Sequence, residues 1–470
     1  MKRTTASLFD SMLPDIKTSI PGPRSLELAT TLGRYENRNV TFLASEFPIF
    51  WKAAEGANVW DADGNRFLDL TAGFAVAAHG HNHPAIREAI VKQSEKLFHA
   101  MGDVHPAENK AVLCRRLSEI TFERWGIGPG KTTLCNSGFE AVEVAIKTSL
   151  LHSGKSGAIA FTGGYHGLGY GALDLIGIPW FRQPFEQHLR DFTTWVPFPN
   201  CYRCPFGRTE GYRLAGSRFP NCASSCLAAI EEQIVHTIRQ RPIGCIVVEP
   251  CLGRGGEVVP PLDFLHMLRE ICDTYKILLV FDEIYTGFNR TGTLFGCEQF
   301  GVYPDLVCIG KGLTTGFPLS ACVGRSEVMD AWPRSKGEAL HTTTFLGNPI
   351  GCAMALASID LHLDPAIPVR VASLGRYFRD QLESVTLAAI GHVRGLGLML
   401  GVELIRPDGS PDGESARNVV QHGLQDGLLF LAGAPAGNVI SFTPPFCIET
   451  KEIDFACERI QAYLRLGSIS

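Results

Sequence analysis

Short apolar runs alternate with helical patterns through the middle of the chain. Between 264 and 272, for example, apolar residues recur at the spacing of one helix face. The apolar runs lie at 132–136, 157–162, 243–248, 277–281 and 306–309. Strands that alternate with helices are typical of a mostly parallel sheet covered by helices. The middle of the chain therefore predicts an α/β fold.

The two ends of the chain have a different pattern. Residues 58–69 contain two short strand patterns around Asp63-Gly64, a pair that suits a hairpin turn. After about residue 346 come helices, a strand over 395–403 and a last amphipathic helix near 453–464. We predict that both ends form one smaller α+β domain. The expected domains are 1–75 (N-terminal part of the small domain), 76–345 (large domain) and 346–470 (C-terminal part of the small domain).

Composition narrows the class of protein. The chain has 470 residues, of which 45% are hydrophobic and 19% charged, so it suits two folded domains and not a disordered chain. Its formal net charge is −5 and it has no basic block, which disfavours a nucleic-acid partner. The first 23 residues make a poor signal peptide, and no apolar stretch is long enough for a membrane span. A cytoplasmic location is the expectation.

Polar residues with possible chemistry follow the ends of the predicted strands, where ligands bind in open α/β sheets. Asp282 ends one apolar run, and a buried carboxylate there needs a cationic partner such as a protonated pyridine nitrogen. Lys311 follows another run, between Gly310 and Gly312, and apolar surroundings lower the pKa of a lysine as a Schiff-base amine requires. Taken singly, Asp282 also suits a helix cap or an ion pair, and Lys311 a solvated loop.

Two turns add to this picture. Asn136-Ser-Gly-Phe-Glu140 lies between a strand and a helix, where free backbone amides form a phosphate seat. Gly163-Gly-Tyr-His-Gly167 follows a strand and brings an aromatic ring near the same sheet edge. Each turn is weak evidence alone, but several motifs in a fixed order are far more specific than any one.

Together these segments resemble the class III aminotransferases, the fold-type I pyridoxal-phosphate enzymes that include 4-aminobutyrate, ornithine and other ω-amino-acid aminotransferases. The resemblance runs from about Phe50 to Leu464, and Lys311 follows Asp282 by the 29 positions typical of that family. The matching segments are Asp61–Leu70, Gly80–Pro84, Asn136–Glu143, Gly164–Gly167, Glu249–Pro250, Asp282–Gly292, Lys311–Gly312 and Thr344–Pro349.

The resemblance implies a fold and a set of roles. The fold is a mostly parallel seven-stranded sheet in a large domain, with a smaller domain built from both termini. Lys311 would hold pyridoxal 5′-phosphate as a Schiff base and move the proton, while Asp282 would bind the pyridinium. Thr344 would reach the phosphate in the neighbouring subunit of a homodimer. Further residues implied in binding the cofactor are Ser137, Gly138, Phe139, Tyr165 (stacked on the ring), His166 (supporting Tyr165), Glu249 and Tyr285.

Three positions depart from the family pattern. Tyr285 stands where many relatives have a glutamine that donates to the cofactor, and a phenol can also donate. Arg254 stands where relatives often have an acidic residue, and Ser441 where many have an arginine that grips a substrate carboxylate. We hypothesise that Arg254 takes over the carboxylate; the alternative is a solvent-facing or subunit-contact arginine. Phe74, Arg254 and Ser441 are the expected substrate contacts.

Histidine and cysteine clusters raise the question of a metal. His79, His81 and His83 alternate, but they fall in a family loop before a helix, so no metal site is expected there. The chain has 15 cysteines, many inside apolar runs where they read as small buried side chains. Cys201, Cys204, Cys222 and Cys226 form two close pairs, and for these a zinc or iron–sulfur site, a disulfide and free thiols all stay open.

The leading function is a ping-pong aminotransferase that takes an amino group from an ω-amino acid or primary amine, of the 4-aminobutyrate kind, to a 2-oxo acid. The second is an amino-acid racemase or epimerase of the same fold, since Lys311 and Asp282 would serve both and Ser441 weakens glutamate as partner. The third, a pyridoxal-binding regulator, would want an added DNA-binding domain, which the ends of this chain do not suggest.

Overall fold

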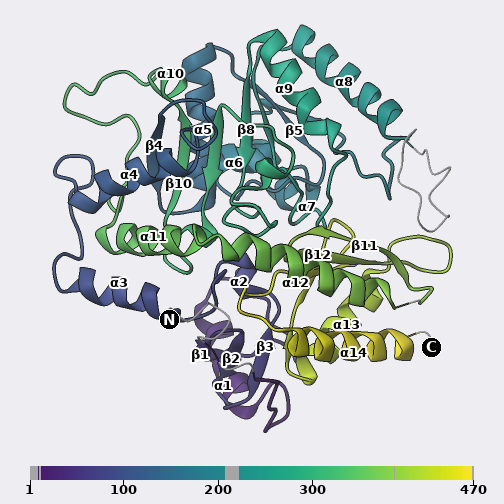
Figure 1. Cartoon of the computed structure of the whole chain (residues 1–470). Coiled ribbons are helices and arrows are strands. Elements are labelled where there is room, and N and C mark those ends of the chain that lie inside the picture. The colour runs from purple at the N-terminus through teal and green to yellow at the C-terminus, as the bar shows by residue number, and fades with distance from the viewer. Residues whose placement is uncertain (1–8, 10–11, 207–221, 386, 468–470) are drawn as a thin grey trace. The chain divides into compact units, whose positions relative to one another are not determined.

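The computed structural model describes residues 9, 12–206, 222–385 and 387–467. The chain divides into two compact units, which we call the small unit (1–87 with 369–470) and the large unit (88–368). Figure 1 shows the large unit as a sheet between helices and the small unit as shorter strands with helices. Two helices cross the division: α3 (Pro84–Ser94) and α12 (Ala366–Glu383).

The division falls later along the chain than the expected boundaries at 75 and 345. Residues 76–87 stay in the small unit because the ring of His79 packs on Phe446, 5.6 Å between centroids, and Phe446 donates its N–H to the carbonyl of Ala78. Helix α11 (Pro349–His362) stays in the large unit because Asn109 Nδ2, on α4 (Glu108–Ile120), donates to the Pro349 carbonyl at 2.7 Å.

A seven-stranded sheet forms the centre of the large unit, in the order β4-β10-β9-β8-β7-β5-β6. The two pairings of β10, with β4 and with β9, are antiparallel and the other four are parallel, so the sheet is mostly parallel as predicted. The strands are β4 (Gly130–Cys135), β5 (Gly157–Phe161), β6 (Thr193–Val196), β7 (Ile243–Val248), β8 (Leu278–Asp282), β9 (Leu306–Ile309) and β10 (Ser320–Arg325).

Helices cover both faces of this sheet, which explains why its central strands β7, β8 and β9 are buried at every position. On one face, α5 packs its alanines and valines on β7, β8 and β9. On the other, Phe264 of α9 meets Phe161 of β5, 5.3 Å between ring centroids. Besides α4 and α11, the large unit contains the helices α5 (Gly138–Ser153), α6 (Tyr170–Leu175), α7 (Pro179–Arg182), η2 (Gln183–His188), α8 (Cys222–Gln240), α9 (Asp263–Tyr275), η3 (Gly296–Gln299), η4 (Lys311–Leu313) and α10 (Ser326–Met329).

The small unit contains two four-stranded sheets, in the orders β1-β2-β3-β13 and β11-β12-β15-β14. Its strands are β1 (Trp51–Glu55), β2 (Asn58–Asp61), β3 (Arg66–Asp69), β11 (Ile390–Leu396), β12 (Met399–Leu404), β13 (Leu428–Leu429), β14 (Leu431–Gly433) and β15 (Val439–Phe442). Its helices are α1 (Pro23–Tyr35), α2 (Ala72–Ala75), α13 (Gly413–Gln425) and α14 (Thr450–Gly467). The predicted hairpin around Gly64 is β2–β3, and the predicted last helix is α14.

One predicted strand of the small unit is wrong. Residues 395–403 do not form a single strand but parts of the antiparallel pair β11–β12, in which Leu396 lies opposite Met399. Gly397 has φ +54, a left-handed conformation that glycine adopts without a steric penalty. The chain therefore reverses there, inside an apolar run that looked continuous.

No single helix among the described residues is long and apolar enough to cross a membrane. Only α11 and α12 together reach that length and composition, and they are bent by 71° at the break between them.

Candidate active site

The two residues with the strongest predicted chemistry lie on neighbouring strands of the large unit. Asp282 is the last residue of β8 and pairs with Cys308 of β9 in the sheet register. Lys311 follows β9 directly after Gly310 and begins the short helical turn η4. Both therefore stand at the carboxyl edge of the parallel strands, the edge where α/β sheets bind ligands.

A buried histidine holds the Asp282 carboxylate. His166 Nδ1 lies 2.9 Å from Asp282 Oδ2, and the Ile284 N–H donates to Oδ1 at 3.1 Å. Burial disfavours a charged imidazole, but the hydrogen bond and charge of Asp282 outweigh it and raise the pKa of His166. The imidazole was expected to support Tyr165; in the structure it binds Asp282, from 116 positions away in the sequence.

The amine of Lys311 is partly shielded from water. Its Nζ lies 4.6 Å from the centroid of the Tyr285 ring, a cation–π distance. Burial lowers the pKa of Lys311 to about 8, helped by the charge of Arg254 and opposed by Asp282 and Glu249. A neutral amine, the form that attacks a carbonyl, is therefore accessible near neutral pH.

Glu249, at the end of β7, ties two loops together. Its Oε1 accepts the N–H of Tyr165 at 3.0 Å and its Oε2 accepts the N–H of Gly253 at 3.0 Å. Burial, with a further contribution from the charge of Asp282, raises the pKa of Glu249 to about 7, although His166 and the two N–H donors lower it. One carboxylate thus fixes the loops that carry the Tyr165 ring and Arg254.

Arg254 lies against two aromatic rings. Its guanidinium carbon is 5.1 Å from the centroid of Tyr165 and 5.2 Å from that of Phe181, and these rings touch each other at 5.3 Å. The side chain is nonetheless exposed. A planar cation supported by two rings keeps its N–H donors for another partner. Phe181 did not stand out in the sequence, since a Phe in a short helix carries no signal of its own.

The turn between β4 and α5 has the properties of an anion-binding site. Ser137 Oγ is buried, and Ser137 forms a capping box with Glu140 at the start of α5. Gly138 opens α5 and lies close to Ile284, whose Cδ1 would be 2.9 Å from a Cβ at this position. The Ser137 carbonyl is fixed by Ser320 Oγ at 2.5 Å. Phe139, the second helical residue, is 37% exposed.

The loop before α11 also reaches this turn. Asn136 Nδ2 donates to Thr343 Oγ1 at 2.9 Å, and the adjacent Thr344 is exposed. Within the chain, Thr343 therefore connects this loop to the turn between β4 and α5, while the side chain of Thr344 faces solvent.

Two predicted substrate residues belong to the small unit. Phe74 lies in α2, where four successive residues have positive φ, and its ring is 58% exposed. Ser441 lies on β15, opposite Gly401 of β12 and Leu431 of β14.

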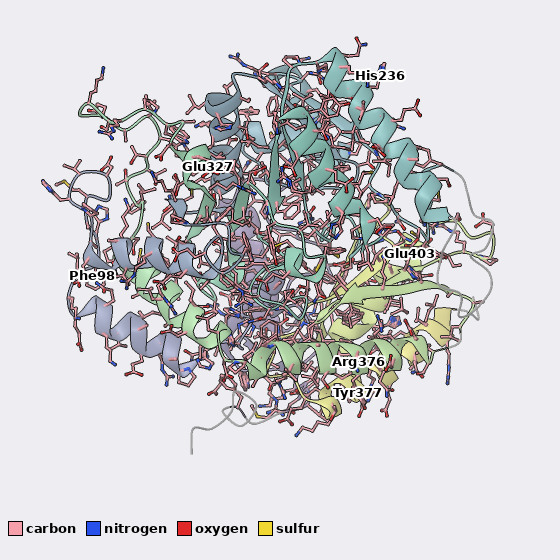
Figure 2. All side chains as sticks on the ribbon, turned by 45° about the horizontal axis from the view of Figure 1, so that its top comes forward. Phe98, His236, Glu327, Arg376, Tyr377 and Glu403 are labelled. Carbon is pink, nitrogen blue, oxygen red and sulfur yellow. The ribbon has the colours of Figure 1, made fainter. Side chains whose placement is uncertain are left out.

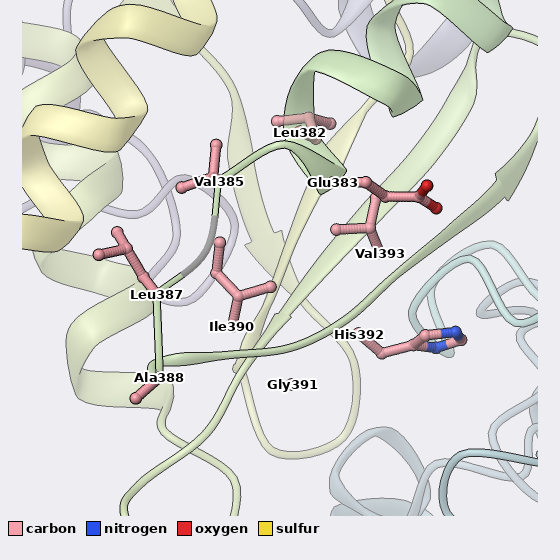
Figure 3. A pocket seen from close by; sticks show the side chains of 9 residues that line it. All are labelled: Leu382, Glu383, Val385, Leu387, Ala388, Ile390, Gly391, His392 and Val393. Atoms are coloured by element: carbon pink, nitrogen blue, oxygen red, sulfur yellow. The ribbon is translucent and has the colours of Figure 1, made fainter. Parts of the chain in front are cut away.

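A pocket of about 540 Å³ also lies in the small unit. Figure 3 shows its lining, from the end of α12 to the first half of β11. Burial, with the charge of Arg394, lowers the pKa of His392 in this lining to about 4, so the ring is neutral at ordinary pH. The lining contains none of the predicted site residues.

The predicted metal candidates are not gathered into a site. In the described part of the chain no group of three or more His, Cys, Asp or Glu side chains could hold a metal ion. His81 Nε2 instead lies 2.7 Å from Asp69 Oδ2. The cysteine set cannot be placed as a whole, because the side chain of Cys222 lies outside the described residues while Cys201, Cys204 and Cys226 lie within them.

The polar groups at this edge of the large unit match the parts of pyridoxal 5′-phosphate. An amine of lowered pKa suits the aldehyde, and a buried carboxylate suits a protonated ring nitrogen. The buried hydroxyl of Ser137, beside the first amides of α5, suits a phosphate.

Comparison with known proteins agrees with this chemistry. The family model described as "Aminotransferase class-III" matches residues 42–464. The 4-aminobutyrate aminotransferase of Mycobacterium leprae is 34% identical, over 92% of this chain and 93% of that protein. An alanine/serine racemase of Pyrococcus horikoshii is 31% identical, over 96% of this chain and 93% of its own length.

A solved structure shares the fold. The amine transaminase of an uncultivated Pseudomonas species, in its PLP-bound form, superposes with a TM-score of 0.83 at 26% identity, over 92% of this chain and 98% of that one. The family model matches most of the chain, and the two relatives are more than 30% identical over almost its whole length, which is more than a shared fold alone would give. The chain belongs to the class III aminotransferases.

Proposed function

We propose that this aminotransferase moves an amino group from an ω-amino acid or primary amine to a 2-oxo acid, using pyridoxal 5′-phosphate held by Lys311. The observation that carries the proposal is the pair of Lys311 and Asp282 at the carboxyl edge of the sheet. Lys311, whose pKa is lowered, follows β9, and the buried carboxylate of Asp282 ends the neighbouring strand β8. The two successive half-reactions need one reusable amine, and Lys311 is placed to supply it.

Each part of the cofactor has a proposed binding group. Asp282, oriented by His166, holds the ring nitrogen in its protonated form. Ser137 and the amides of Gly138 and Phe139 hold the phosphate. Tyr165 lies against the ring; Tyr285 faces the Lys311 amine and donates to the ring oxygen; Glu249 keeps the Tyr165 loop in place.

The bound cofactor supplies an aldehyde that bonds to amines and a ring that accepts an electron pair. The chain supplies the proton transfer. With the cofactor bound, the neutral Lys311 amine would accept the proton that the substrate carbon loses and would later donate it back. Burial keeps the pKa of Lys311 near 8, low enough for this exchange at neutral pH.

The test of the function is a two-substrate assay. Enzyme loaded with the cofactor is given 4-aminobutyrate or a primary amine with pyruvate or 2-oxoglutarate, and the new amino acid is measured by chromatography. Formation of alanine or glutamate only when both substrates are present supports the aminotransferase. The alternative is a racemase, favoured by the similarity to the alanine/serine racemase. It would change the optical rotation of an amino acid with no 2-oxo acid present.

Arg254 is the proposed anchor for the carboxylate of the 2-oxo acid. Its guanidinium is exposed, stacked on Tyr165 and Phe181, and close enough to affect the charge of Lys311. We expect Arg254→Ala to raise the KM for the 2-oxo acid by about tenfold or more, since a charge-assisted hydrogen bond to a carboxylate is lost. The KM for an uncharged amine donor should change little, so the two half-reactions are measured separately.

A lysine at this position gives the matched control. Arg254→Lys keeps the charge but loses the planar pair of donors, and we expect an intermediate KM. An unchanged KM for the 2-oxo acid in Arg254→Ala would show that Arg254 only faces solvent. The predicted substrate roles of Phe74 and Ser441 stay predictions, and profiles of donor use in Phe74→Ala and Ser441→Ala would test them.

We also propose a homodimer. The large unit exposes apolar side chains on two neighbouring loops: Phe98 (64% exposed, labelled in Figure 2), Met101, Val104, Leu340 and Phe345. The loops are joined by the ring contact of His99 with Phe345 and by the hydrogen bond from Thr342 to Asp103. Exposed apolar patches of this kind mark protein interfaces.

Sedimentation equilibrium is expected to give twice the chain mass of 51.2 kDa. Replacing Phe98 and Met101 by Asp should shift the protein toward the monomer, because two charges would have to be buried. Val91→Asp, an exposed apolar position on α3, is the control. A wild-type monomer at micromolar concentration would contradict the proposal. The cytoplasmic location stays a prediction, which cell fractionation would test.

A further inference from the structure

The backbone that carries Lys311 is strained. Lys311 has φ +44, in the left-handed region that residues with a side chain seldom adopt. A second left-handed segment, Phe288 with φ +56 and Asn289 with φ +62, lies in the loop that follows β8. Such a conformation costs free energy and persists only where the surrounding structure holds the residue in place.

Two side chains of α11 hold the peptide that follows Lys311. The carbonyl of Gly312 accepts a hydrogen bond from Ser358 Oγ at 2.8 Å and lies 3.3 Å from His362 Nε2. Ser358 is fully buried and His362 is 2% exposed. The Lys311 side chain is thus attached to a peptide that is fixed from the opposite side, within the core of the large unit.

Asn289 completes the connection to the second strained segment. Its Nδ2 donates to the His362 carbonyl at 2.8 Å and lies 3.2 Å from His362 Nδ1. If Nδ1 accepts from Asn289, Nε2 carries the proton and donates to Gly312, so one neutral tautomer satisfies both contacts. Burial lowers the pKa of His362 to about 3, which keeps this tautomer neutral at any working pH.

Close packing leaves the two segments little room to move. A Cβ on Gly312 would lie 2.9 Å from Phe288 Cβ, and the Phe288 ring packs on His362 with centroids 5.2 Å apart. Phe288 itself is 1% exposed. The strained turn at Lys311 is therefore held by hydrogen bonds on its carbonyl and by contact with the other strained segment.

We propose that Ser358, His362 and Asn289 are positioning residues, which fix the Lys311–Gly312 peptide so that the Lys311 amine is presented to the cofactor aldehyde. The inference rests on the proposed role of Lys311 and extends it to residues that touch neither substrate nor cofactor. Their loss would let the turn relax toward ordinary φ values, and the amine would spend less time in the reactive position.

The experiment measures covalent capture apart from non-covalent binding. Full-length enzyme freed of cofactor is mixed with pyridoxal phosphate. The Lys311 nitrogen bonds to the aldehyde carbon and one water leaves; borohydride then adds a hydride to that carbon. Mass spectrometry gives the modified residue, and quenching at a series of times gives the rate. Pyridoxamine phosphate has no aldehyde, so its Kd reports on the binding site without Lys311 chemistry.

Ser358→Ala and Asn289→Gly are the main variants; glycine keeps the left-handed backbone at 289 without the side chain. We expect capture at Lys311 to slow by about tenfold in each, while the Kd of pyridoxamine phosphate stays within about twofold. His362→Gln, which keeps an N–H donor, should capture faster than His362→Phe. Ser149→Ala is the matched control, since Ser149 is also buried and its hydroxyl donates to the carbonyl of Ala145 in its own helix, α5.

Two results would overturn the inference. Capture at the wild-type rate in Ser358→Ala and Asn289→Gly would mean that the peptide needs no support. An equal loss of capture and of pyridoxamine phosphate binding would mean that these residues only maintain the fold. A wild-type label on a residue other than Lys311 is a separate outcome, because it removes the proposed function of Lys311 on which the inference rests.

Discussion

Replacing Lys311 by alanine is expected to lower kcat for amino transfer by about 10⁴-fold or more, because this amine both captures the cofactor aldehyde and moves the proton. The lowered pKa, near 8, is what makes the amine effective in both tasks at neutral pH. Each half-reaction is followed by rapid-scan absorbance after the variant has been loaded with cofactor. Loss should be seen in both half-reactions, since the same amine serves each of them.

Chemical rescue separates the proton-transfer role from simple damage. A small primary amine such as methylamine can enter the space left in Lys311→Ala, and it should restore part of the rate in proportion to its concentration and basicity. Lys92→Ala, an exposed lysine on α3 that pairs with Glu88, is the control and should keep the full rate. A Lys311→Ala enzyme that retains more than about 1% of kcat would contradict the assignment.

The sequence predicted the sheet edge well because the central strands are buried on both faces. β7, β8 and β9 are therefore continuous apolar runs, and the residue that ends each run stands out: Glu249 follows β7, Asp282 ends β8, and Lys311 comes just after β9. The binding turn at Gly138 was predicted for a similar reason, since a strand, a small turn and a helix are all local patterns. Local patterns thus located Asp282, Lys311 and the turn at Gly138, while most of the other candidate residues came from the family resemblance.

Other features depend on contacts that no local pattern encodes. The pairing of His166 with Asp282 joins positions 116 residues apart, and the stacking of Arg254 on Phe181 joins the loop after β7 to the short helix α7. The network at Gly312 likewise needs α11, whose apolar residues are spread around the helix. The β11–β12 reversal was missed because Gly397 sits inside an apolar run, where only the backbone angle reveals the turn.

Replacing Asp282 by asparagine is expected to lower kcat by about 10²- to 10⁴-fold while leaving the chain folded, because a neutral amide cannot hold the cofactor nitrogen in its protonated form. The side chain keeps its shape and can still accept from the Ile284 N–H. The cofactor should remain bound through Lys311 and the turn at Ser137. The measured signs are a lower kcat at saturating substrate and a shifted pH dependence of the cofactor absorbance.

The pKa of His166 gives a second readout that a merely structural effect would not produce. Asp282 raises the pKa of His166 against the cost of burial, so removing the Asp282 charge should lower this pKa. The imidazole should then lose its proton at a lower pH than in the wild type. NMR titration of labelled histidine measures the change. Asp305→Asn is the control: Asp305 is a buried carboxylate at the opposite end of β9, where it accepts the Leu279 N–H. If Asp305→Asn lowers kcat as much as Asp282→Asn does, the effect belongs to the fold and not to the cofactor, and the role of Asp282 fails.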